Sequence, residues 1–180
     1  MSKLSPDEKS ARERERMIET AKQYSTGTYC RKFVSVIFQR MIRAEAGADP
    51  RLFVTAVVDG KIQQVARRVG QCVCVTCGKV DSWDSGIKGI HCGHFIASRR
   101  NSILLEEDNC EPQCSHCNFY GSGMANEFRI WMLKMKGQDV IDRLQKLKTQ
   151  SVTFSRDELV SMRIEYSRRL KAAELKMKSG

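Results

Sequence analysis

Apolar residues recur at helical spacing toward both ends of the chain and lose that spacing in the middle. Residues 28–46 have the pattern of an amphipathic helix with one buried face, and Gly47 is expected to end it. The apolar face consists of Phe33, Val34, Ile37, Phe38, Met41 and Ile42. The segment Ser5-Pro6-Asp7-Glu8 predicts a capped helix start. The helix that follows, to about Gln23, has few apolar residues and is expected to be a solvated arm.

Helices are also predicted for most of the C-terminal third. One runs from Gly123 to Gly137 and a second from about 138 to 148, and Ser155 with Glu158 forms the capping box of a last helix. The apolar positions of this last helix recur every three or four residues and form a seam: Leu159, Met162, Tyr166, Leu170 and Ala173. Such a seam packs either against the protein's own core or against a second copy in a dimer.

Residues 50–70 fit two structures. Segments 53–58 and 61–65 are compatible with a hairpin that turns at Asp59-Gly60. Segment 62–68 also fits a helix, which is the structure that we predict for this second half. Residues 71–120 are rich in Cys, Gly, Asn and His and predict short strands and tight turns.

The charge pattern indicates a polyanionic partner. The net charge is +10, and both flanks, 1–70 and 131–180, are basic, whereas residues 71–130 are slightly acidic. Basic arms around such a centre suit a nucleic acid held by the flanks and a metal ion held in the middle, although solvated basic helices would give the same count. The chain has no apolar run of the ~18 residues that a membrane span needs, and its N-terminus has no signal-peptide core. We therefore expect a cytoplasmic protein with no membrane partner.

Seven of the eight cysteines lie between residues 72 and 117, and four of them have the spacing of a zinc site. Cys74 and Cys77 form one C-x-x-C pair, and Cys114 and Cys117 form another after 36 intervening residues. Each two-residue gap lets a tight turn supply two of the four tetrahedral ligands of Zn²⁺. Cys72 would be an alternative to Cys74 with poorer spacing. The two remaining cysteines of the region, Cys92 and Cys110, are interpreted as small buried residues.

Residues between the two pairs and directly after the second pair suit phosphodiester hydrolysis. His94 is the candidate general base, because neutral imidazole accepts a proton at physiological pH. Asn118 and His91 are candidate ligands of a catalytic Mg²⁺ or Mn²⁺, and Asn109 is expected to fasten the loop that orients His94. Arg99 and Arg100 are placed to touch phosphates.

Each of these residues also has a simpler interpretation. His94 would be a zinc ligand or a packed core histidine, and Asn118 a helix cap. His91 would be a surface residue, and Arg99 and Arg100 part of a solvated turn. His116, inside the second cysteine pair, is expected to be exposed and to have no role.

These motifs resemble the phage lambda NinG (Rap) recombination proteins. The resemblance runs through Cys74-x-x-Cys77-Gly78, Gly93-His94-Phe95, Asn109, Gln113-Cys114-x-x-Cys117-Asn118 and Ser122-Gly123. It continues through 137–142 and the final stretch from Phe154 to Lys171, and covers about 100 residues in all. It implies an HNH (ββα-metal) nuclease that cuts Holliday junctions and D-loops. The site is also similar to that of phage endonuclease VII. The family usually has Asp where this chain has His91, and imidazole suits Mn²⁺ better than Mg²⁺.

We therefore expect a helix-dominated α+β protein with a small zinc-stapled ββα core of the HNH, treble-clef-like type. The expected regions are a basic helical part at 1–70, the nuclease core at 71–130 and a helical part at 131–180 for dimer or DNA contacts. The expected function is metal-assisted nicking of branched DNA by a homodimer in the cytoplasm of a phage's bacterial host. The alternatives are a non-catalytic zinc-finger protein that binds nucleic acid and an HNH nickase of ordinary duplex DNA.

Overall fold

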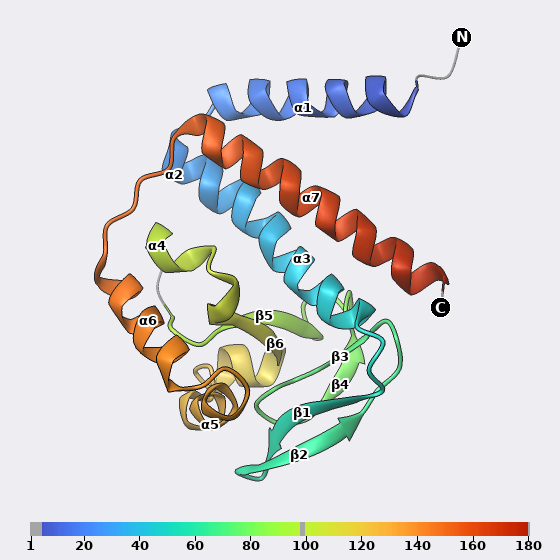
Figure 1. Ribbon diagram of the computed structural model, residues 1–180, viewed down its shortest axis with the longest axis vertical. Coiled ribbons are helices and arrows are strands. Elements are labelled where there is room, and N and C mark those ends of the chain that lie inside the picture. The colour runs from blue at the N-terminus through green and yellow to red at the C-terminus, as the bar shows by residue number, and fades with distance from the viewer. Residues whose placement is uncertain (1–4, 98–99, 180) are drawn as a thin grey trace.

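The computed structural model describes residues 5–97 and 100–179, which form a helix-dominated α+β structure with small sheets (Figure 1). The α-helices are α1 (Pro6–Lys22), α2 (Thr26–Tyr29), α3 (Ser35–Ala48), α4 (Asn101–Leu104), α5 (Ala125–Met135), α6 (Gln138–Thr149) and α7 (Arg156–Ser179). Two π-helical turns, η1 (Cys30–Val34) and η3 (His116–Tyr120), and one 3-10 turn, η2 (Glu107–Asn109), complete the helical structure of the described residues. The strands are β1 (Phe53–Val58), β2 (Lys61–Ala66), β3 (Gln71–Val73), β4 (Val80–Ser82), β5 (Ile90–His94) and β6 (Cys110–Cys114).

Helices from the two ends of the chain form one layer. In Figure 1, α7 lies along α3, and α1 crosses above α7, while the sheets and α5 lie on the other side of α3. The seam of α7 packs inside the protein, because Leu159, Leu170 and Ala173 are buried. Leu170 and Ala173 belong to an apolar cluster with Phe38 and Met41 of α3, and Leu159 belongs to another that contains Met17 and Ala21 of α1. The N-terminal and C-terminal regions are therefore joined by a common core.

The predicted caps of the long terminal helices are confirmed. In α1 the backbone N–H of Ser5 donates to Glu8 Oε2 over 2.7 Å, and Glu8 N–H donates back to Ser5 Oγ. The same exchange joins Ser155 and Glu158 before α7. The description of α1 as a solvated arm is only partly right, because Met17 and Ala21 are buried against the rest of the helical layer.

The prediction of a helix at 62–68 is wrong. The strands β1 and β2 form an antiparallel hairpin in which Val58 pairs with Lys61 around Asp59-Gly60. Both turn residues have positive φ, 50° and 72°, as the two-residue hairpin turn requires. The misleading signal came from β2 itself, whose residues are mostly exposed, so the strand has no apolar alternation of the kind that marks a half-buried strand.

Gly47 does not end α3, as the sequence suggested, because the helix continues through Ala48. A Cβ atom on Gly47 would lie 2.9 Å from Cβ of Trp83. The glycine is therefore explained by the close approach of α3 to the segment after β4, and not by a helix cap.

A buried arginine joins the end of α3 to the hairpin. The side chain of Arg67 is fully buried and donates hydrogen bonds to four backbone carbonyls, those of Gly47, Asp49, Arg51 and Gln71. Its guanidinium also lies 3.9 Å from the carboxylate of Asp49. The positive charge is therefore compensated in the interior, and one guanidinium serves as a donor to all four carbonyls.

Replacing Arg67 with Met should destabilise the protein by ~3–5 kcal/mol, because buried carbonyls and a carboxylate lose their charged partner. The exposed neighbour Arg68 provides the control, and Arg68→Met should change the free energy of unfolding by less than ~0.5 kcal/mol. Urea unfolding of the two variants beside the wild type measures this difference. Equal midpoints for the two variants would contradict the role that we give to Arg67.

The division into regions 1–70, 71–130 and 131–180 stays a prediction.

Among residues 5–97 and 100–179, none of the helices combines the length and the apolar character that a membrane crossing requires.

Candidate functional site

Two tight turns present the four predicted cysteines. The first turn follows β3, where the N–H groups of Cys77 and Gly78 both donate to the Cys74 carbonyl. Gly78 has φ of +76°, a conformation that glycine adopts without strain. Cys114 ends β6, and Cys117 lies one turn later in η3.

The four sulfur atoms come together as a set that could hold a metal ion such as zinc. They all lie within 4.8 Å of one another, and Cys77 Sγ is 3.7 Å from Cys114 Sγ. Zn–S bonds of 2.3 Å in a tetrahedron separate their sulfur atoms by about 3.8 Å, so the observed spacing fits zinc. Cys72 is excluded from the set, since its sulfur contacts the Arg43 carbonyl. The cluster therefore includes Cys74 and not Cys72.

The hydrogen bonds of Cys74 favour its thiolate form, whereas burial raises the pKa of Cys117 to about 12. A hydrogen bond from the Cys77 thiol lowers the pKa of Cys74 to about 4, and the same bond raises the pKa of Cys77. Thr76 Oγ1, 3.3 Å from Cys74 Sγ, adds to the lowering. A negative sulfur among polar hydrogen-bond donors is the form that binds metal.

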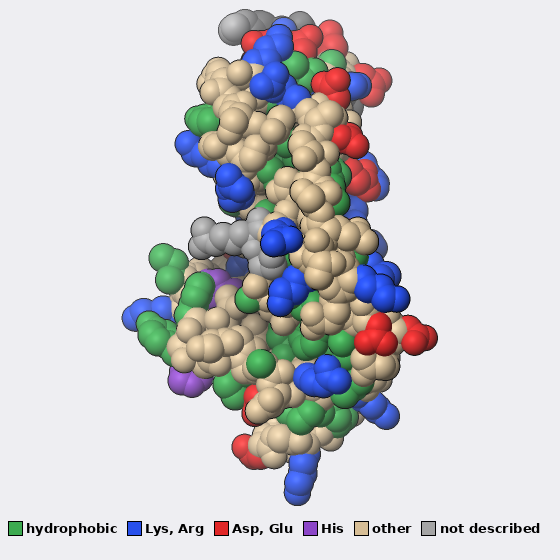
Figure 2. All heavy atoms as spheres, turned by 90° about the vertical axis from the view of Figure 1, so that its left-hand side faces the viewer, with side chains coloured by type: hydrophobic (Ala, Val, Ile, Leu, Met, Phe, Trp, Pro, Cys, Tyr) green, Lys and Arg blue, Asp and Glu red, His purple; other side chains and the backbone are tan. Residues whose placement is uncertain are grey.

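Beside this cluster, β5 and β6 form an antiparallel pair, and η3 follows β6 directly. The pair and η3 form one wall of a cavity of about 850 Å³, to which His91, His94 and Asn118 all contribute. Arg31, Ser35 and Gln39 of the helical layer also line the cavity. On the face shown in Figure 2, the surface is hollowed at mid-height, with a histidine at the edge of the hollow and basic side chains above and below.

His94 is held with its imidazole neutral. Its Nε2 lies 3.3 Å from the carbonyl oxygen of Leu104, to which a protonated nitrogen can donate. Burial lowers the pKa of His94, and the carbonyls of Leu104 and Cys92 only partly oppose this shift. The ring therefore keeps one nitrogen free of a proton at neutral pH.

His91 and Asn118 face the same cavity from β5 and η3. The His91 Nε2 atom is 2.7 Å from the carbonyl oxygen of Ile87, and its ring packs edge-on against Phe119 with the centroids 4.9 Å apart. These two contacts fix the orientation of the ring, and the hydrogen bond to Ile87 uses Nε2 and not Nδ1. His91 is thus more constrained than a freely solvated surface histidine.

Asn109 lies where the predicted fastening role requires it. Its side chain is fully buried, its Oδ1 accepts from Ile96 N–H over 2.8 Å, and its Nδ2 donates to the Ile96 carbonyl. The Asn109 carbonyl also accepts from the N–H of Phe95. Asn109 therefore fixes the two residues that follow His94.

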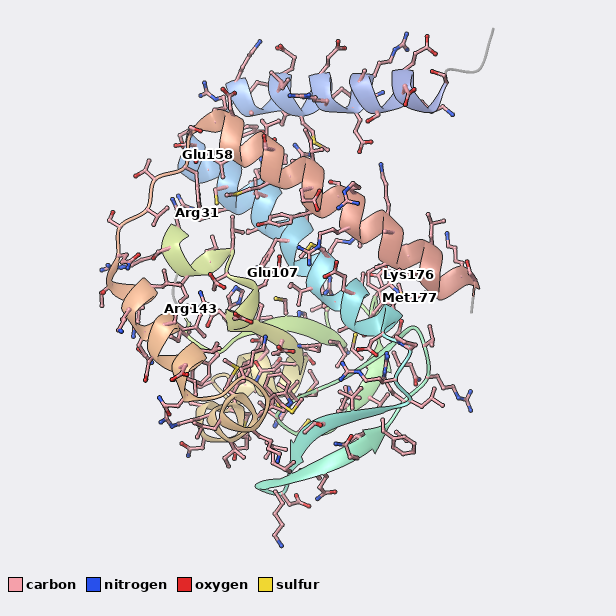
Figure 3. All side chains as sticks on the ribbon, viewed as in Figure 1. Arg31, Glu107, Arg143, Glu158, Lys176 and Met177 are labelled. Atoms are coloured by element: carbon pink, nitrogen blue, oxygen red, sulfur yellow. The ribbon has the colours of Figure 1, made fainter. Side chains whose placement is uncertain are left out.

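Salt bridges hold the acidic segment before Asn109 from two sides. Arg143 of α6 contacts Glu106 and Asp108 at 3.1 and 2.7 Å, and Arg169 of α7 contacts Glu107 and Glu45. Figure 3 shows Arg143 on the α6 side of this segment and Glu107 on the side of α3 and α7. Two arginines thus pair with four carboxylates and neutralise part of the acidic charge of this segment.

A buried amide, Gln113, connects the two cysteine turns. Its Nε2 donates to Thr76 Oγ1 over 3.1 Å and to the Gly123 carbonyl over 2.8 Å. Gly93 on the paired strand makes room for it, because a Cβ atom there would lie 2.2 Å from Gln113 Oε1.

Gly93→Ala should therefore destabilise the protein by ~1–3 kcal/mol, since Gln113 has to leave its place and give up buried hydrogen bonds. Gly27→Ala is the matched control. A Cβ atom at Gly27 would meet only the mobile end of Arg31 at 3.3 Å, and alanine favours the helix. Thermal unfolding distinguishes the two, and a Gly93→Ala midpoint at or above that of Gly27→Ala would refute the packing argument.

Not every predicted residue is placed in the cavity. Arg99 lies outside the described residues, and Arg100 is an exposed residue at the start of α4. His116 is exposed, as expected. The contribution of Arg31 was missed, because nothing in the sequence links a helical residue near position 30 to residues near 94 and 118. Figure 3 shows Arg31 where α2 faces α4.

Comparison with known proteins identifies a family match that includes the residues of this site. The family model described as Bacteriophage Lambda NinG protein matches residues 57–176, which include all four clustered cysteines, His94, Asn109 and Asn118. The chain is 25% identical over 101 residues to Protein ninG of Escherichia phage lambda, covering 54% of this chain and 46% of that protein. It thus spans about half the length of this relative. No solved structure matches the chain. Because the family model covers about two thirds of the sequence, the chain belongs to the bacteriophage lambda NinG family.

Proposed function

We propose that this protein is a metal-dependent endonuclease of the HNH type that nicks branched DNA. The observation that carries the proposal is the meeting of His94 and Asn118 at one cavity, on a strand pair and a helical turn joined by four cysteines. In this proposal, β5, β6 and η3 are the ββα element, and zinc on Cys74, Cys77, Cys114 and Cys117 fixes it.

The residues divide the chemical work between them. Neutral His94 takes a proton from the attacking water, and its contact with Leu104 keeps the ring oriented. The amide oxygen of Asn118 and the imidazole of His91 would hold a divalent ion, Mg²⁺ or Mn²⁺. Such an ion supplies charge stabilisation at the phosphate and the leaving oxygen. Asn109 acts indirectly, by fixing the backbone next to His94.

The binding of DNA is supported by charge. The net charge is +10, and a basic residue, Arg31, lines the same cavity as His94. Arginine contacts to phosphate position the backbone without reading sequence, which suits an enzyme that recognises a branch by shape. The preference for branched substrates rests on the NinG resemblance, and a homodimer would pair two nicks across a junction.

The proposal is tested with a mobile four-way junction and a linear duplex of the same sequence, each incubated with the full chain and Mn²⁺ or Mg²⁺. We expect nicks in the junction at a rate at least ~10-fold above the duplex, because shape is the recognised feature. Equal nicking of both substrates would favour an HNH nickase of ordinary duplex DNA. Tight binding without any cleavage in either metal would favour a non-catalytic zinc-finger protein and overturn the proposal.

A further inference from the structure

We propose that Cys92, His94 and Cys110 form a second metal site, distinct from the four-cysteine site, that takes a thiophilic divalent ion such as Zn²⁺. The ligand atoms of these three residues lie within 4.8 Å of one another. Two sulfurs and one imidazole nitrogen are a donor set that zinc and cadmium favour and that Mg²⁺ disfavours. The sequence alone suggested that the two cysteines only fill space.

The strand register explains why the three side chains meet. His94 pairs with Cys110 across β5 and β6, and Cys92 pairs with Pro112, so Cys92 is the diagonal neighbour of Cys110. Cys92 and His94 are two residues apart on one strand and therefore share a face. The three positions thus converge through the backbone pairing of this sheet and do not depend on a mobile loop.

The second ring nitrogen of His94 has the partner that a metal-binding histidine needs. Its Nε2 lies 3.3 Å from the Leu104 carbonyl, which assigns metal binding to Nδ1. The Cys92 carbonyl also contacts the ring, and a metal bond would replace any hydrogen bond that Nδ1 makes to it. A ligand histidine usually donates its other N–H to a carbonyl or a carboxylate, which fixes the tautomer and the orientation of the ring.

The charge of a divalent ion at this site would be balanced by the two cysteine thiolates. Cys92 and Cys110 are 7% and 2% exposed and belong to an apolar cluster with Phe38 and Leu170. An isolated thiolate there would be costly, whereas two thiolates and one divalent cation are neutral together. Binding releases the two thiol protons to solvent.

The site is open on one side. Cys92 and His94 line the cavity of about 850 Å³, so an ion can enter there, and a fourth coordination position would face the cavity. Three protein ligands with an open position differ from the closed four-cysteine site, and the affinity for zinc should be correspondingly lower.

Occupancy of this second site has a consequence that rests on the proposed function. His94 cannot bind a metal through Nδ1 and accept a proton at the same atom. Zinc at the second site should therefore inhibit DNA nicking, whereas Mg²⁺ or Mn²⁺ at His91 and Asn118 supports it.

The zinc content of the purified full chain tests the site without reference to activity. After equilibration with Zn²⁺ and removal of free ion, we expect two zinc ions per chain in the wild type and in Cys30→Ala, a buried cysteine outside both clusters. Cys92→Ala/Cys110→Ala should hold one. With Co²⁺ in place of zinc, the thiolate-to-metal absorption of the double variant should fall, because two of its six thiolate ligands are gone.

One zinc ion per chain in the wild type, or two in the double variant, would overturn the second site. If the double variant binds no metal because it does not fold, the zinc content of His94→Ala is measured instead. One zinc ion per chain in this variant would support the second site, and two would refute it. The failure of one proposal can be distinguished from the failure of the other. Two zinc ions per chain without nuclease activity would support the second metal site and contradict the proposed function. Nuclease activity with a single zinc ion per chain would support the proposed function and contradict the second metal site.

Discussion

Removing the zinc ion that we propose at the four cysteines is expected to unfold the centre of the protein, residues 71–123, while part of the helical layer persists. The four cysteines replace apolar side chains in that part of the interior. The cluster around them contains Cys72, Cys74, Cys114 and Cys117 but only one fully buried aliphatic residue, Ile90. A core of this kind has little hydrophobic stabilisation of its own.

The size of the effect follows from the ligand set. Structural zinc on thiolates contributes ~10–16 kcal/mol of apparent binding free energy, more than the whole stability of a typical small domain. The helices α1, α3 and α7 are different, because they bury large side chains such as Phe38, Met41 and Leu159 against one another. We therefore expect unfolding to be confined mainly to the cysteine-rich region.

Amide hydrogen exchange of the protein with and without a strong chelator measures this. Protection should be lost in β5, β6 and the two cysteine turns, and should return when Zn²⁺ is added back under reducing conditions. Cys77→Ser should behave like the chelated protein, and Cys30→Ala should not. Retention of full protection by metal-free protein would show that the four cysteines are only packed core residues.

The parts of this structure that depend on neighbours in sequence were predictable. Capping boxes at Ser5 and Ser155 act over three residues, and each C-x-x-C pair acts within a single turn, so the sequence contains their complete signal. The apolar spacing of segments α5 and α6 likewise predicted helices, and the structure buries one face of each, with Phe128, Ile141 and Leu144 in one apolar cluster.

Features that depend on distant partners were not predictable. Gly47 looks like a helix end until Trp83 is known to lie against it, and β2 looks like a helix because neither of its faces is buried. Arg31 reaches the cavity only because η1 and α3 lie beside the strand pair. The convergence of Cys92 and Cys110 depends on the register of β5 with β6, which no local pattern encodes.

The largest effect on activity is expected from His94→Ala. If His94 is the general base, the single-turnover rate of junction nicking should fall by ~10²–10⁴, the usual contribution of a positioned proton acceptor. The affinity for the junction should change little, because the imidazole is neutral and most of its surface is buried. Rapid-quench measurements with saturating protein, Mn²⁺ and no added Zn²⁺ separate the chemical step from binding and from the second metal site.

His116→Ala is the matched control, since this histidine is exposed in the same region and lies outside the cavity. Its rate should stay within about twofold of the wild type, because surface substitutions away from a site have small effects. Zinc content at the four cysteines shows whether each variant is folded. A folded His94→Ala protein that nicks junctions as fast as His116→Ala would remove His94 from the chemistry. Burial, the Leu104 contact and the nearby thiols would then mark it as a residue of the second metal site alone.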